Sequence, residues 1–329
     1  MVRKSILHVD DLHTYFKTEH GVVPSVNGVS FQVKEGETLA IVGESGSGKS
    51  VTSLSVMGLI EAPGKVEKGE ILFAGKDLTA ISKKEYRKLR GNEIAMIFQE
   101  PLTSLNPLFT VGNQLSESIK LHQKVDKKIA KVKSIEMLQQ VGIPRAEKVY
   151  HSFPHVLSGG MRQRVMIAMA LSCNPTLLIA DEPTTALDVT IQAQILELMK
   201  KLAKEHQTAI LLITHDLGVV AEMADNVVVM YAGQVVEYTD VFTLFSDPKH
   251  PYTKGLLDST PKFYETEEKL ESIQGTVPTP ATMPHGCKFH PRCPYAMDIC
   301  VAKEPELEER SADHKVRCWL TEEKEAVVS

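Results

Sequence analysis

The sequence lacks the features that would place the chain in a membrane, outside the cell or on nucleic acid. No apolar run approaches the roughly 18 residues that a membrane-spanning helix needs. Residues 1–5 lack the apolar core of a secretion signal. The formal net charge is −5, so no basic excess is present to attract nucleic acid. We therefore expect a cytosolic chain, or one docked on the cytoplasmic face of a membrane through a partner.

Cysteine is scarce over most of the chain, and no internal repeat is present. Only 5 cysteines occur among 329 residues, and four of them fall in the last part of the sequence. The hydrophobic content of 43% is enough for a large core, and the length suggests two domains. The composition shifts after Asp247-Pro248. We expect a first domain over residues 1–245 and a second over 246–329.

Residues 43–50 are the most informative stretch of the chain. They follow the apolar run 39–42 and match the phosphate-binding pattern G-x-x-x-x-G-K-[ST] between a strand and a helix. A plain Gly/Ser turn is the alternative, and the strand and helix on either side argue against it. Backbone N–H groups at such a loop surround phosphate oxygens, and its lysine adds positive charge. The expected nucleotide contacts are Gly43, Glu44, Ser45, Gly46, Ser47, Gly48, Lys49, Ser50 and Val51.

A second motif adds hydrolysis to nucleotide binding. The apolar run 177–180 ends in Asp181-Glu182, as expected for a buried parallel strand with carboxylates at its C-terminal end. Asp181 is suited to hold Mg²⁺ together with the Ser50 hydroxyl, and Glu182 to orient or deprotonate the attacking water. Alone, the pair would be an ordinary acidic strand end. Next to a phosphate-binding loop it predicts a nucleotide hydrolase.

A third motif lies at residues 157–164, Leu-Ser-Gly-Gly-Met-Arg-Gln-Arg, ahead of the apolar helix 165–172. It resembles the signature sequence of ATP-binding cassette (ABC) ATPases. A serine and backbone amides at a helix start form a further anion site. The resemblance implies that this site faces the γ-phosphate of ATP held by the opposite subunit. The residues concerned are Ser158, Gly159 and Gly160.

Three more elements of the ABC family follow in the expected order. Gln99 follows the strand 94–98 and resembles the glutamine loop, a further ligand for Mg²⁺. Asp188 closes Ala186-Leu187-Asp188, which resembles the loop that contacts the partner subunit. His215 follows the strand 210–214 and matches the γ-phosphate sensor. A lone histidine there is more often structural, but its position after Asp188 favours the sensor role.

Two aromatic residues are candidates for stacking on the adenine ring, as the family resemblance implies. Phe16 fits the strand phase better than Tyr15. We expect a long loop over 17–25, and this loop leaves open which of the two positions aligns with the adenine-stacking residue of the family. Either ring could instead be ordinary core packing.

The pattern along the chain predicts a doubly wound α/β fold of the P-loop NTPase class. Short strands and turns over residues 5–98, with one charged helix at 83–90, indicate an antiparallel β portion. Residues 99–164 are helical and polar, with helices near 111–123 and 127–141. Strands and helices then alternate to about residue 238. The fold class is therefore an α/β ABC ATPase with a helical insertion and a cysteine-rich C-terminal extension.

The clustered cysteines favour a metal over disulfides in a cytosolic chain. Four thiolates can hold zinc or an iron–sulfur cluster, and the spacing C-x₅-C-x₆-C-x₁₇-C does not decide between these and free thiols. Cys173 lies in an apolar helix and is expected to be a core residue. The candidate ligands are Cys287, Cys293, Cys300 and Cys318.

The C-terminal part narrows the family. Residues 100–107, 250–253, 277–280 and 284–294 resemble segments of oligopeptide/dipeptide importer ATPases, and the likeness spans about residues 5–320. It implies a [4Fe–4S] cluster on the four cysteines, with zinc as the alternative. A structural role is expected for this centre because the extension is polar and rich in proline, and redox sensing is the second possibility.

One departure from the signature motif bears on the partner. Met161 stands where the family usually has glutamine, and methionine cannot donate an amide hydrogen bond. Within the importer family this implies a heterodimer with a second, distinct ATPase. The resemblance further implies two membrane permeases, an extracellular peptide-binding protein, and transmission of movement through residues 99–115.

The expected function is ATP hydrolysis that drives di- or oligopeptide uptake. An importer of nickel or sugar fragments would share the fold and the tail. A soluble regulatory ATPase or an exporter subunit would share only the core, and the chain lacks a second cassette, a long coiled-coil insert or membrane helices.

Overall fold

The computed structural model describes residues 3–19, 21–99, 104–185, 187–260, 273–279 and 282–320. The chain crosses several times between two compact units, so neither unit is one continuous segment. The first unit comprises Met1–Ile6, Val33–Thr38 and Ala80–Ile213. The second comprises Leu7–Gln32, Leu39–Thr79 and Thr214–Ser329.

The first unit contains three parallel strands with β7 in the middle. These are β6 (Ile94–Ile97), β7 (Leu177–Asp181) and β8 (Ala209–Ile213). Every residue of β7 and β8 is buried. Runs of leucine, isoleucine and alanine without alternation suit strands that are covered on both faces. The expected buried strands at 177–180 and 210–214 are therefore confirmed to within one residue.

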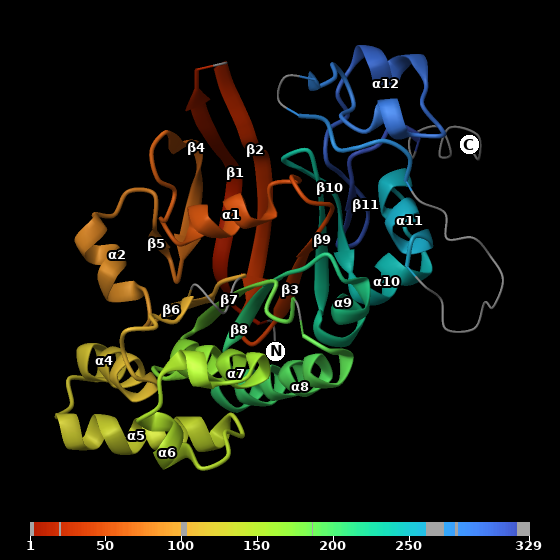
Figure 1. Cartoon of the computed structure of the whole chain (residues 1–329). Coiled ribbons are helices and arrows are strands. Elements are labelled where there is room, and N and C mark those ends of the chain that lie inside the picture. The colour runs from red at the N-terminus through yellow and green to blue at the C-terminus, as the bar shows by residue number, and fades with distance from the viewer. Residues whose placement is uncertain are drawn as a thin grey trace. The chain divides into compact units, whose positions relative to one another are not determined.

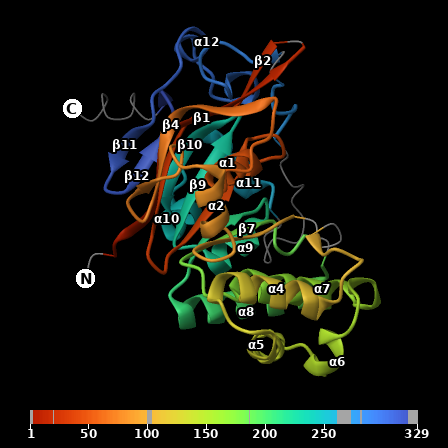
Figure 2. The same ribbon diagram turned by 90° about the vertical axis from the view of Figure 1, so that its left-hand side faces the viewer.

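The helices of the first unit fill the region that the sequence predicts to be a helical insertion. Helices α4 to α7 pack on one another in two perpendicular views (Figures 1 and 2). Buried hydroxyls join three of them, because Ser116 Oγ lies 2.9 Å from both Ser134 Oγ and the Tyr150 hydroxyl. The helices of this unit are α2 (Lys83–Leu89), α4 (Val111–Gln123), α5 (Lys127–Gln140), α6 (Ala146–Tyr150), η1 (Pro154–Val156), α7 (Gly159–Leu171) and α8 (Val189–His206).

The second unit holds a four-stranded sheet in the order β2-β1-β4-β5. Strand β1 pairs antiparallel with β4, so that Val9 faces Ile71. The expected long loop over residues 17–25 is wrong. Strand β1 reaches Thr18 and β2 begins at Gly21, because the β-branched Val22 and Val23 favour an extended strand. The strands are β1 (Ser5–Thr18), β2 (Gly21–Lys34), β4 (Gly64–Phe73) and β5 (Lys76–Asp77).

The second unit also holds five strands in the order β11-β12-β10-β9-β3. Strands β3 and β9 are parallel, and the other pairs are antiparallel. The C-terminal extension therefore contributes β11 and β12 to the sheet that contains β3. The strands are β3 (Thr38–Val42), β9 (Asn226–Tyr231), β10 (Gln234–Asp240), β11 (Glu308–Ser311) and β12 (His314–Val316).

Short helices surround this second unit. None of the helices in the described ranges is long and apolar enough to cross a bilayer. The helices of the second unit are α1 (Lys49–Val56), α9 (Leu217–Met223), α10 (Val241–Ser246), α11 (Pro251–Asp258), η3 (His290–Arg292) and α12 (Asp298–Ala302).

The core of the second unit joins the extension to strand β3. Ala40 of β3 lies in the same buried cluster as Val229 and as the extension residues Tyr252 and Phe289. The rings of Tyr231, Tyr252 and Phe289 lie within 4.7 to 5.4 Å of one another, centre to centre. Such aromatic contacts stabilise a core beyond simple area burial. The extension is thus packed against the strand that leads into the phosphate-binding loop.

Candidate nucleotide-binding site

The loop after β3 has the backbone that phosphate binding requires. A side chain at Gly43 would come within 2.2 Å of the Met230 carbonyl oxygen, and one at Gly48 within 2.5 Å of the Ser25 carbonyl oxygen. Both glycines also have positive φ, of 149° and 101°. Gly46, at φ 82°, faces open space with no atom within 4 Å of a Cβ. The loop is therefore held tightly on one side and open on the other, as a phosphate cradle would be.

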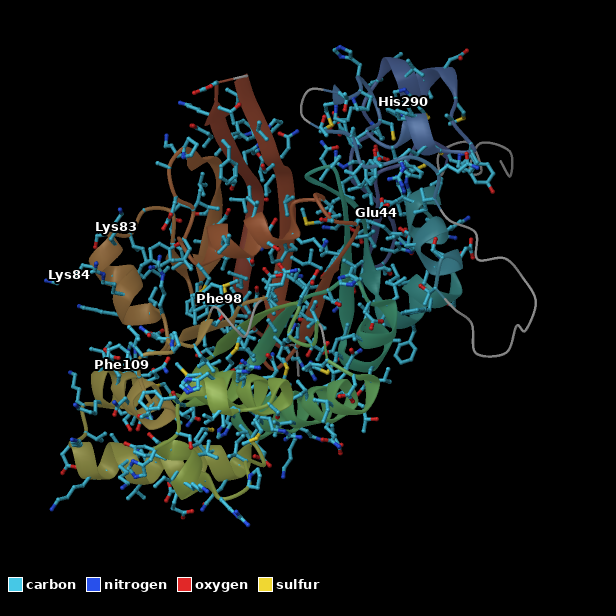
Figure 3. The ribbon with its side chains drawn as sticks, viewed as in Figure 1. Glu44, Lys83, Lys84, Phe98, Phe109 and His290 are labelled. Carbon is cyan, nitrogen blue, oxygen red and sulfur yellow. The ribbon has the colours of Figure 1, made fainter. Side chains whose placement is uncertain are left out.

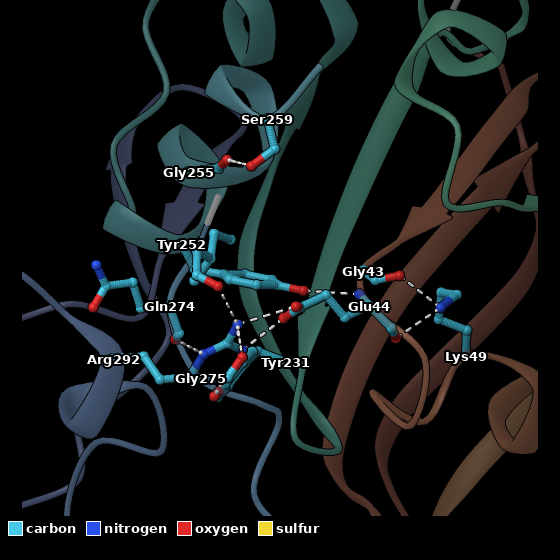
Figure 4. Close-up of polar contacts among 11 residues, drawn as sticks. Gly43, Glu44, Lys49, Tyr231, Tyr252, Gly255, Ser259, Gln274, Gly275 and Arg292 are labelled. Carbon is cyan, nitrogen blue, oxygen red and sulfur yellow. Dashed lines mark hydrogen bonds and ion pairs between the residues drawn. The ribbon is translucent and has the colours of Figure 1, made fainter. Parts of the chain in front are cut away.

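Lys49 lies inside this loop. Its side chain is buried, and its Nζ donates hydrogen bonds to the carbonyl oxygens of Gly43 at 2.7 Å and Glu44 at 3.0 Å (Figure 4). Helix α1 begins at Lys49, and its N-cap residue Gly48 provides no side-chain cap. A positive helix end and an ammonium group thus meet at one place, which favours an anion. Ser50 is half-buried in the first turn.

The remaining loop residues differ in exposure. Ser45 is exposed, Ser47 is buried, and Glu44 and Val51 are half-buried.

His215 follows directly after strand β8. The Thr214 amide donates to the Ile41 carbonyl oxygen of β3 at 3.2 Å, so His215 leaves the sheet beside the strand that leads into the phosphate loop. The His215 side chain is exposed. This position suits a group that contacts bound nucleotide.

The two candidate aromatics occupy opposite faces of β1. Thr14 Oγ1 lies 2.8 Å from Ser55 Oγ, so the face that carries Thr14 and Phe16 is turned toward helix α1. The Phe16 ring packs against Gly64, whose Cβ would lie 2.5 Å from it. On the other face, the Tyr15 hydroxyl donates to Asn27 Oδ1 at 2.8 Å. The two rings thus lie on opposite faces of β1, and the preference for Phe16 as the adenine-stacking residue stays a prediction.

The acidic pair lies at the end of β7 in the first unit. Asp181 is buried, with 5% of its surface exposed. Glu182 has a left-handed backbone, with φ 47°, and its amide donates to the Ile213 carbonyl oxygen at 2.8 Å. Its Oε2 accepts hydrogen bonds from Gln99 Nε2 at 2.8 Å and Thr185 Oγ1 at 2.9 Å. Strained backbone and two side-chain donors together fix the direction of this carboxylate.

The signature residues lie at the exposed start of helix α7. Ser158 is the N-cap, and its Oγ accepts from the Met161 amide at 3.3 Å. Ser158 and Gly159 are exposed, and Gly160 packs beside Ile191. Gln163 of α7 makes a buried contact that the sequence did not indicate. Its side-chain amide donates to the Pro183 carbonyl oxygen and so connects α7 to the residues that follow β7.

Asp188 caps a helix in this structure. Its Oδ1 accepts from the Ile191 amide at 3.0 Å at the start of α8, and the residue is exposed. Exposure leaves it accessible to a partner subunit. Of the segments predicted around these motifs, Ala186 and residues 100–103 lie outside the described residues.

The four clustered cysteines line one small cavity in the extension. Its volume is about 10 Å³, which is the room of a single water molecule. His290 (Figure 3), Phe289 and Trp319 also line it. Within the described ranges, no group of three or more His, Cys, Asp or Glu side chains has a geometry ready to hold a metal ion. None of the five cysteines Cys173, Cys287, Cys293, Cys300 and Cys318 forms a disulfide.

Burial raises the pKa of three thiols in this cavity. The pKa of Cys318 rises to about 11, and those of Cys287 and Cys293 also rise, chiefly because burial disfavours the thiolate. The neighbouring cysteines raise the pKa values further. Four thiolates would therefore repel one another here unless a cation joined them. The donor set fits a thiolate-binding metal centre, while the present cavity has room for a single ion.

Comparison with known proteins agrees with the motifs. Residues 26–185 match the family model of ABC transporters, and residues 236–300 match that of the oligopeptide/dipeptide transporter C-terminal region. The chain is 56% identical to the oligopeptide transport ATP-binding protein AppD of Bacillus subtilis, over 98% of each chain. It is 52% identical to the dipeptide transport ATP-binding protein DppD of Escherichia coli, over 95% of this chain and 96% of that one.

A solved structure gives the same fold. It is the dimeric, post-hydrolysis state of an ATP-binding cassette bound to ADP and Pi, with a TM-score of 0.65 and 26% identity. The match covers 71% of this chain and 98% of the other. The resemblance inferred from the signature and tail motifs is confirmed. The chain belongs to the family of ABC transporter ATP-binding proteins, in the branch that carries the oligopeptide/dipeptide transporter C-terminal region.

Proposed function

We propose that this chain is the ATP-binding and ATP-hydrolysing subunit of a bacterial ABC importer that takes up di- and oligopeptides. The observation that carries the proposal is the Glu182 carboxylate, held by Gln99 and Thr185 at the end of β7 in a chain that also has a phosphate loop. The names of the relatives, which are oligopeptide and dipeptide transport proteins, support the substrate class. An importer of nickel or another small solute is the second candidate.

ATP is bound by residues 43–51. The open side of Gly46 gives phosphate oxygens access to the loop backbone. Lys49 exchanges its two carbonyl partners for the β- and γ-phosphates, which are stronger acceptors because they are charged. Phe16 stacks on the adenine, while the hydroxyl contact of Tyr15 with Asn27 makes Tyr15 the weaker candidate.

Hydrolysis depends on residues at the ends of β6, β7 and β8 and on Ser50 of α1. Ser50, Gln99 and Asp181 supply oxygen ligands for Mg²⁺, which neutralises phosphate charge when it is bound. The amide nitrogen of Gln99 faces Glu182, so its carbonyl oxygen is the atom available to the metal. Glu182 orients the attacking water and accepts its proton. His215 contacts the γ-phosphate and distinguishes ATP from ADP.

The ATP site is completed by another ATPase subunit. The exposed Ser158 and Gly159, with the half-buried Gly160 beside them, contact ATP held by the partner, and Asp188 contacts the partner chain. A serine hydroxyl has one proton and two lone pairs, so Ser158 can donate to phosphate while it caps α7. Met161 has no amide to offer, and this favours a heterodimer with a second, distinct ATPase.

Exposed apolar side chains that follow strand β6 form the contact with the permeases. Phe98, Leu108 and Phe109 are exposed in the first unit; Figure 3 labels the two phenylalanines. Large apolar side chains at a protein surface can serve as contacts with a partner protein. Residues 99–115 would pass movement to two membrane permeases, which place the chain peripherally on the cytoplasmic face of the membrane. The extracellular peptide-binding protein acts through those permeases.

The four cysteines of the extension hold a [4Fe–4S] cluster, with zinc as the alternative. Four cysteine side chains without a disulfide line one cavity, and this supports a metal centre. The cavity now has room for one ion, so a cluster would require the cysteine side chains to spread. Such a centre would cross-link the extension and stabilise its fold in addition to the apolar contacts of Tyr252 and Phe289.

Metal analysis tests this assignment. Protein purified without oxygen should contain iron and sulfide near four per chain, the stoichiometry of this cluster. One zinc per chain without iron would contradict the cluster but keep a metal centre. Replacing any one of the four cysteines should expose the extension to protease, whereas Cys173→Ser should not.

The function is tested in the assembled transporter. ATP turnover of the chain, reconstituted with its permeases, second ATPase and binding protein in liposomes, should rise on addition of di- or oligopeptides. Nickel ions and sugar fragments serve as controls. Stimulation by nickel or sugars alone would overturn the peptide assignment, and an absence of ATP hydrolysis in every mixture would overturn the ATPase role.

A further inference from the structure

An arginine of the extension binds a side chain of the phosphate loop. The guanidinium of Arg292 donates to both carboxylate oxygens of Glu44, with N to O distances of 2.7 and 3.1 Å (Figure 4). Only 5% of the Arg292 side chain is exposed. Glu44 is the second residue of the phosphate loop and lies 248 positions away in the sequence. A buried, two-pronged arginine–carboxylate pair fixes the direction of the carboxylate as well as its position.

The other guanidinium contacts hold Arg292 in this orientation. Its nitrogens donate to the carbonyl oxygens of Ile273, Gln274 and Gly275 at 2.8 to 3.3 Å, and the group lies over the Tyr231 ring. Burial alone would lower the pKa of Arg292, but Glu44 raises it above its ordinary value. The arginine therefore stays charged and has several fixed contacts besides Glu44.

A second residue of the extension holds the same point of the loop. The Glu44 backbone amide donates to the Tyr252 hydroxyl at 2.8 Å. The Tyr252 ring is fully buried and packs on Tyr231 and Phe289. Both the backbone and the side chain of Glu44 are thus bound by the extension, one residue from Gly43, whose carbonyl oxygen accepts from Lys49.

The turn that carries Arg292 is bounded by two of the clustered cysteines. The short helix η3 lies between Cys287 and Cys293, and Arg292 directly precedes Cys293. His290 Nδ1 contacts the Cys287 carbonyl oxygen at 2.9 Å, and the Cys293 amide donates to the His290 carbonyl oxygen at 3.2 Å. The same two cysteines line the cavity of the extension. One turn of backbone therefore connects Arg292 to the cysteine cavity.

We propose that Arg292 and Tyr252 are positioning residues of the ATP site, which hold the phosphate loop in its binding shape through Glu44. We further propose that Cys293, which directly follows Arg292 and lines the cysteine cavity, supports this position of Arg292. This proposal rests on the ATPase function proposed above. It gives the extension a role in nucleotide binding in addition to its own stability.

The first experiment measures ATP binding by the full-length chain with the hydrolysis-blocked Glu182→Gln variant as background. Arg292→Ala should raise the Kd for ATP by about fivefold or more, in the range of coupling between sites. Tyr252→Phe should raise it less, and Arg292→Lys should restore part of the affinity because it keeps the charge. In the assembled transporter, Arg292→Ala should raise the KM for ATP more than it lowers kcat.

Lys288→Ala is the matched control. Lys288 belongs to the same extension, but its ammonium group contacts the Glu304 carboxylate at 3.2 Å and the Pro284 carbonyl oxygen at 3.1 Å instead of the phosphate loop. Its removal should leave the Kd for ATP unchanged. Binding is measured well below the unfolding temperature of each variant, so that a loss of stability alone does not alter it.

The second experiment is a double-mutant cycle between the cavity and the arginine. Cys293→Ser should weaken ATP binding in the wild-type background. In the Arg292→Ala background the same change should have little further effect, because the two substitutions act through one path. Additive effects would overturn the coupling through Arg292.

The outcomes separate this proposal from the proposed function. Unchanged ATP affinity in Arg292→Ala, while the parent chain binds ATP, would overturn the positioning role and leave the ATPase function intact. Failure of the parent chain to bind ATP would overturn the ATPase function itself.

Discussion

The first residues of helices α1 and α7 differ in how the helix is capped and in how far they are exposed. Helix α1 begins at Lys49 behind Gly48, which has φ 101° and offers no side-chain cap. Helix α7 begins behind Ser158, whose hydroxyl caps the Met161 amide. Lys49 is buried, whereas Ser158 is exposed.

Under the proposed function, the start of α1 binds the nucleotide of this chain and the start of α7 contacts the nucleotide of a partner. The α1 start combines glycine backbone, a buried ammonium and a positive helix end, so it can enclose phosphate within one chain. The α7 start is already satisfied by its own serine and lies at the surface. Under the proposed function, this helix start contacts a phosphate that is held by another subunit.

The largest expected effect comes from the Glu182 carboxylate at the end of β7. Glu182→Gln should reduce ATP turnover in the assembled transporter by about 10²-fold or more, because a positioned base is lost. ATP binding should be retained. Glu197→Gln, at an exposed position of α8, is the control. Turnover near the wild-type rate in Glu182→Gln would rule out the assigned role.

Lys49 at the start of α1 should contribute strongly to the affinity for ATP. Lys49→Ala should weaken ATP binding by about 10- to 100-fold, as expected for the loss of a charged hydrogen bond. Titration with a fluorescent ATP analogue measures this. The Lys254→Ala variant removes a lysine of α11 outside the loop and should bind ATP normally. Equal affinity of Lys49→Ala and the parent would contradict the account of this loop.

The α7 start should act only across the interface. Ser158→Ala should lower turnover of the assembled complex by about tenfold, since it removes one donor to the partner's ATP. The isolated chain should bind ATP with unchanged affinity. The same substitution should cost about 1 kcal/mol of stability through the lost helix cap. A loss of ATP binding by the isolated variant would show that the two helix starts are not separate in function.

The smallest expected effect is a loss of stability at low pH through His250 of the extension. Burial lowers the pKa of His250, the N-cap of α11, to about 4, below its value near 6.5 in an unfolded chain. The unfolded chain therefore takes up a proton first, and stability falls as the pH drops below about 6.5. The loss should be about 1 kcal/mol between pH 7 and 5.5.

The same region contains a buried carboxylate that adds to the loss at lower pH. Burial would raise the pKa of Glu237, but hydrogen bonds from His314 and from the Lys249 and His250 amides lower it overall. Its stabilising contribution is present above its ordinary pKa and is lost as the pH falls through the lowered value. Denaturant unfolding from pH 7 to 4 measures both effects. His250→Asn keeps a capping oxygen and should flatten the upper part of the curve, and an unchanged slope would contradict this assignment.

Much of the nucleotide site could be predicted from local sequence. The loop at 43–50 and the carboxylates at 181–182 sit beside strands whose apolar runs mark them as buried, and the structure has those strands. Strand alternation also placed Phe16 and Tyr15 on opposite faces. The hairpin near residue 20 was missed because polar residues there suggested a loop, while Val22 and Val23 continued the strand.

Contacts between distant segments could not be predicted. Nothing in the spacing indicates that Arg292 binds Glu44, because a separation of 248 residues is set by packing of the whole unit. The Gln163 contact with Pro183 is hidden for the same reason. The boundary predicted at residue 245 remains a prediction, although Tyr252 and Phe289 share a core with β3.

The central claim is that the ATP site of this chain is completed by another subunit. The direct measurement is ATP turnover by the purified monomeric chain and by the same chain after assembly with the second ATPase and the permeases. The account predicts ATP binding in both samples, weak turnover by the monomer and a marked rise on assembly. Full turnover by the monomer alone would contradict it.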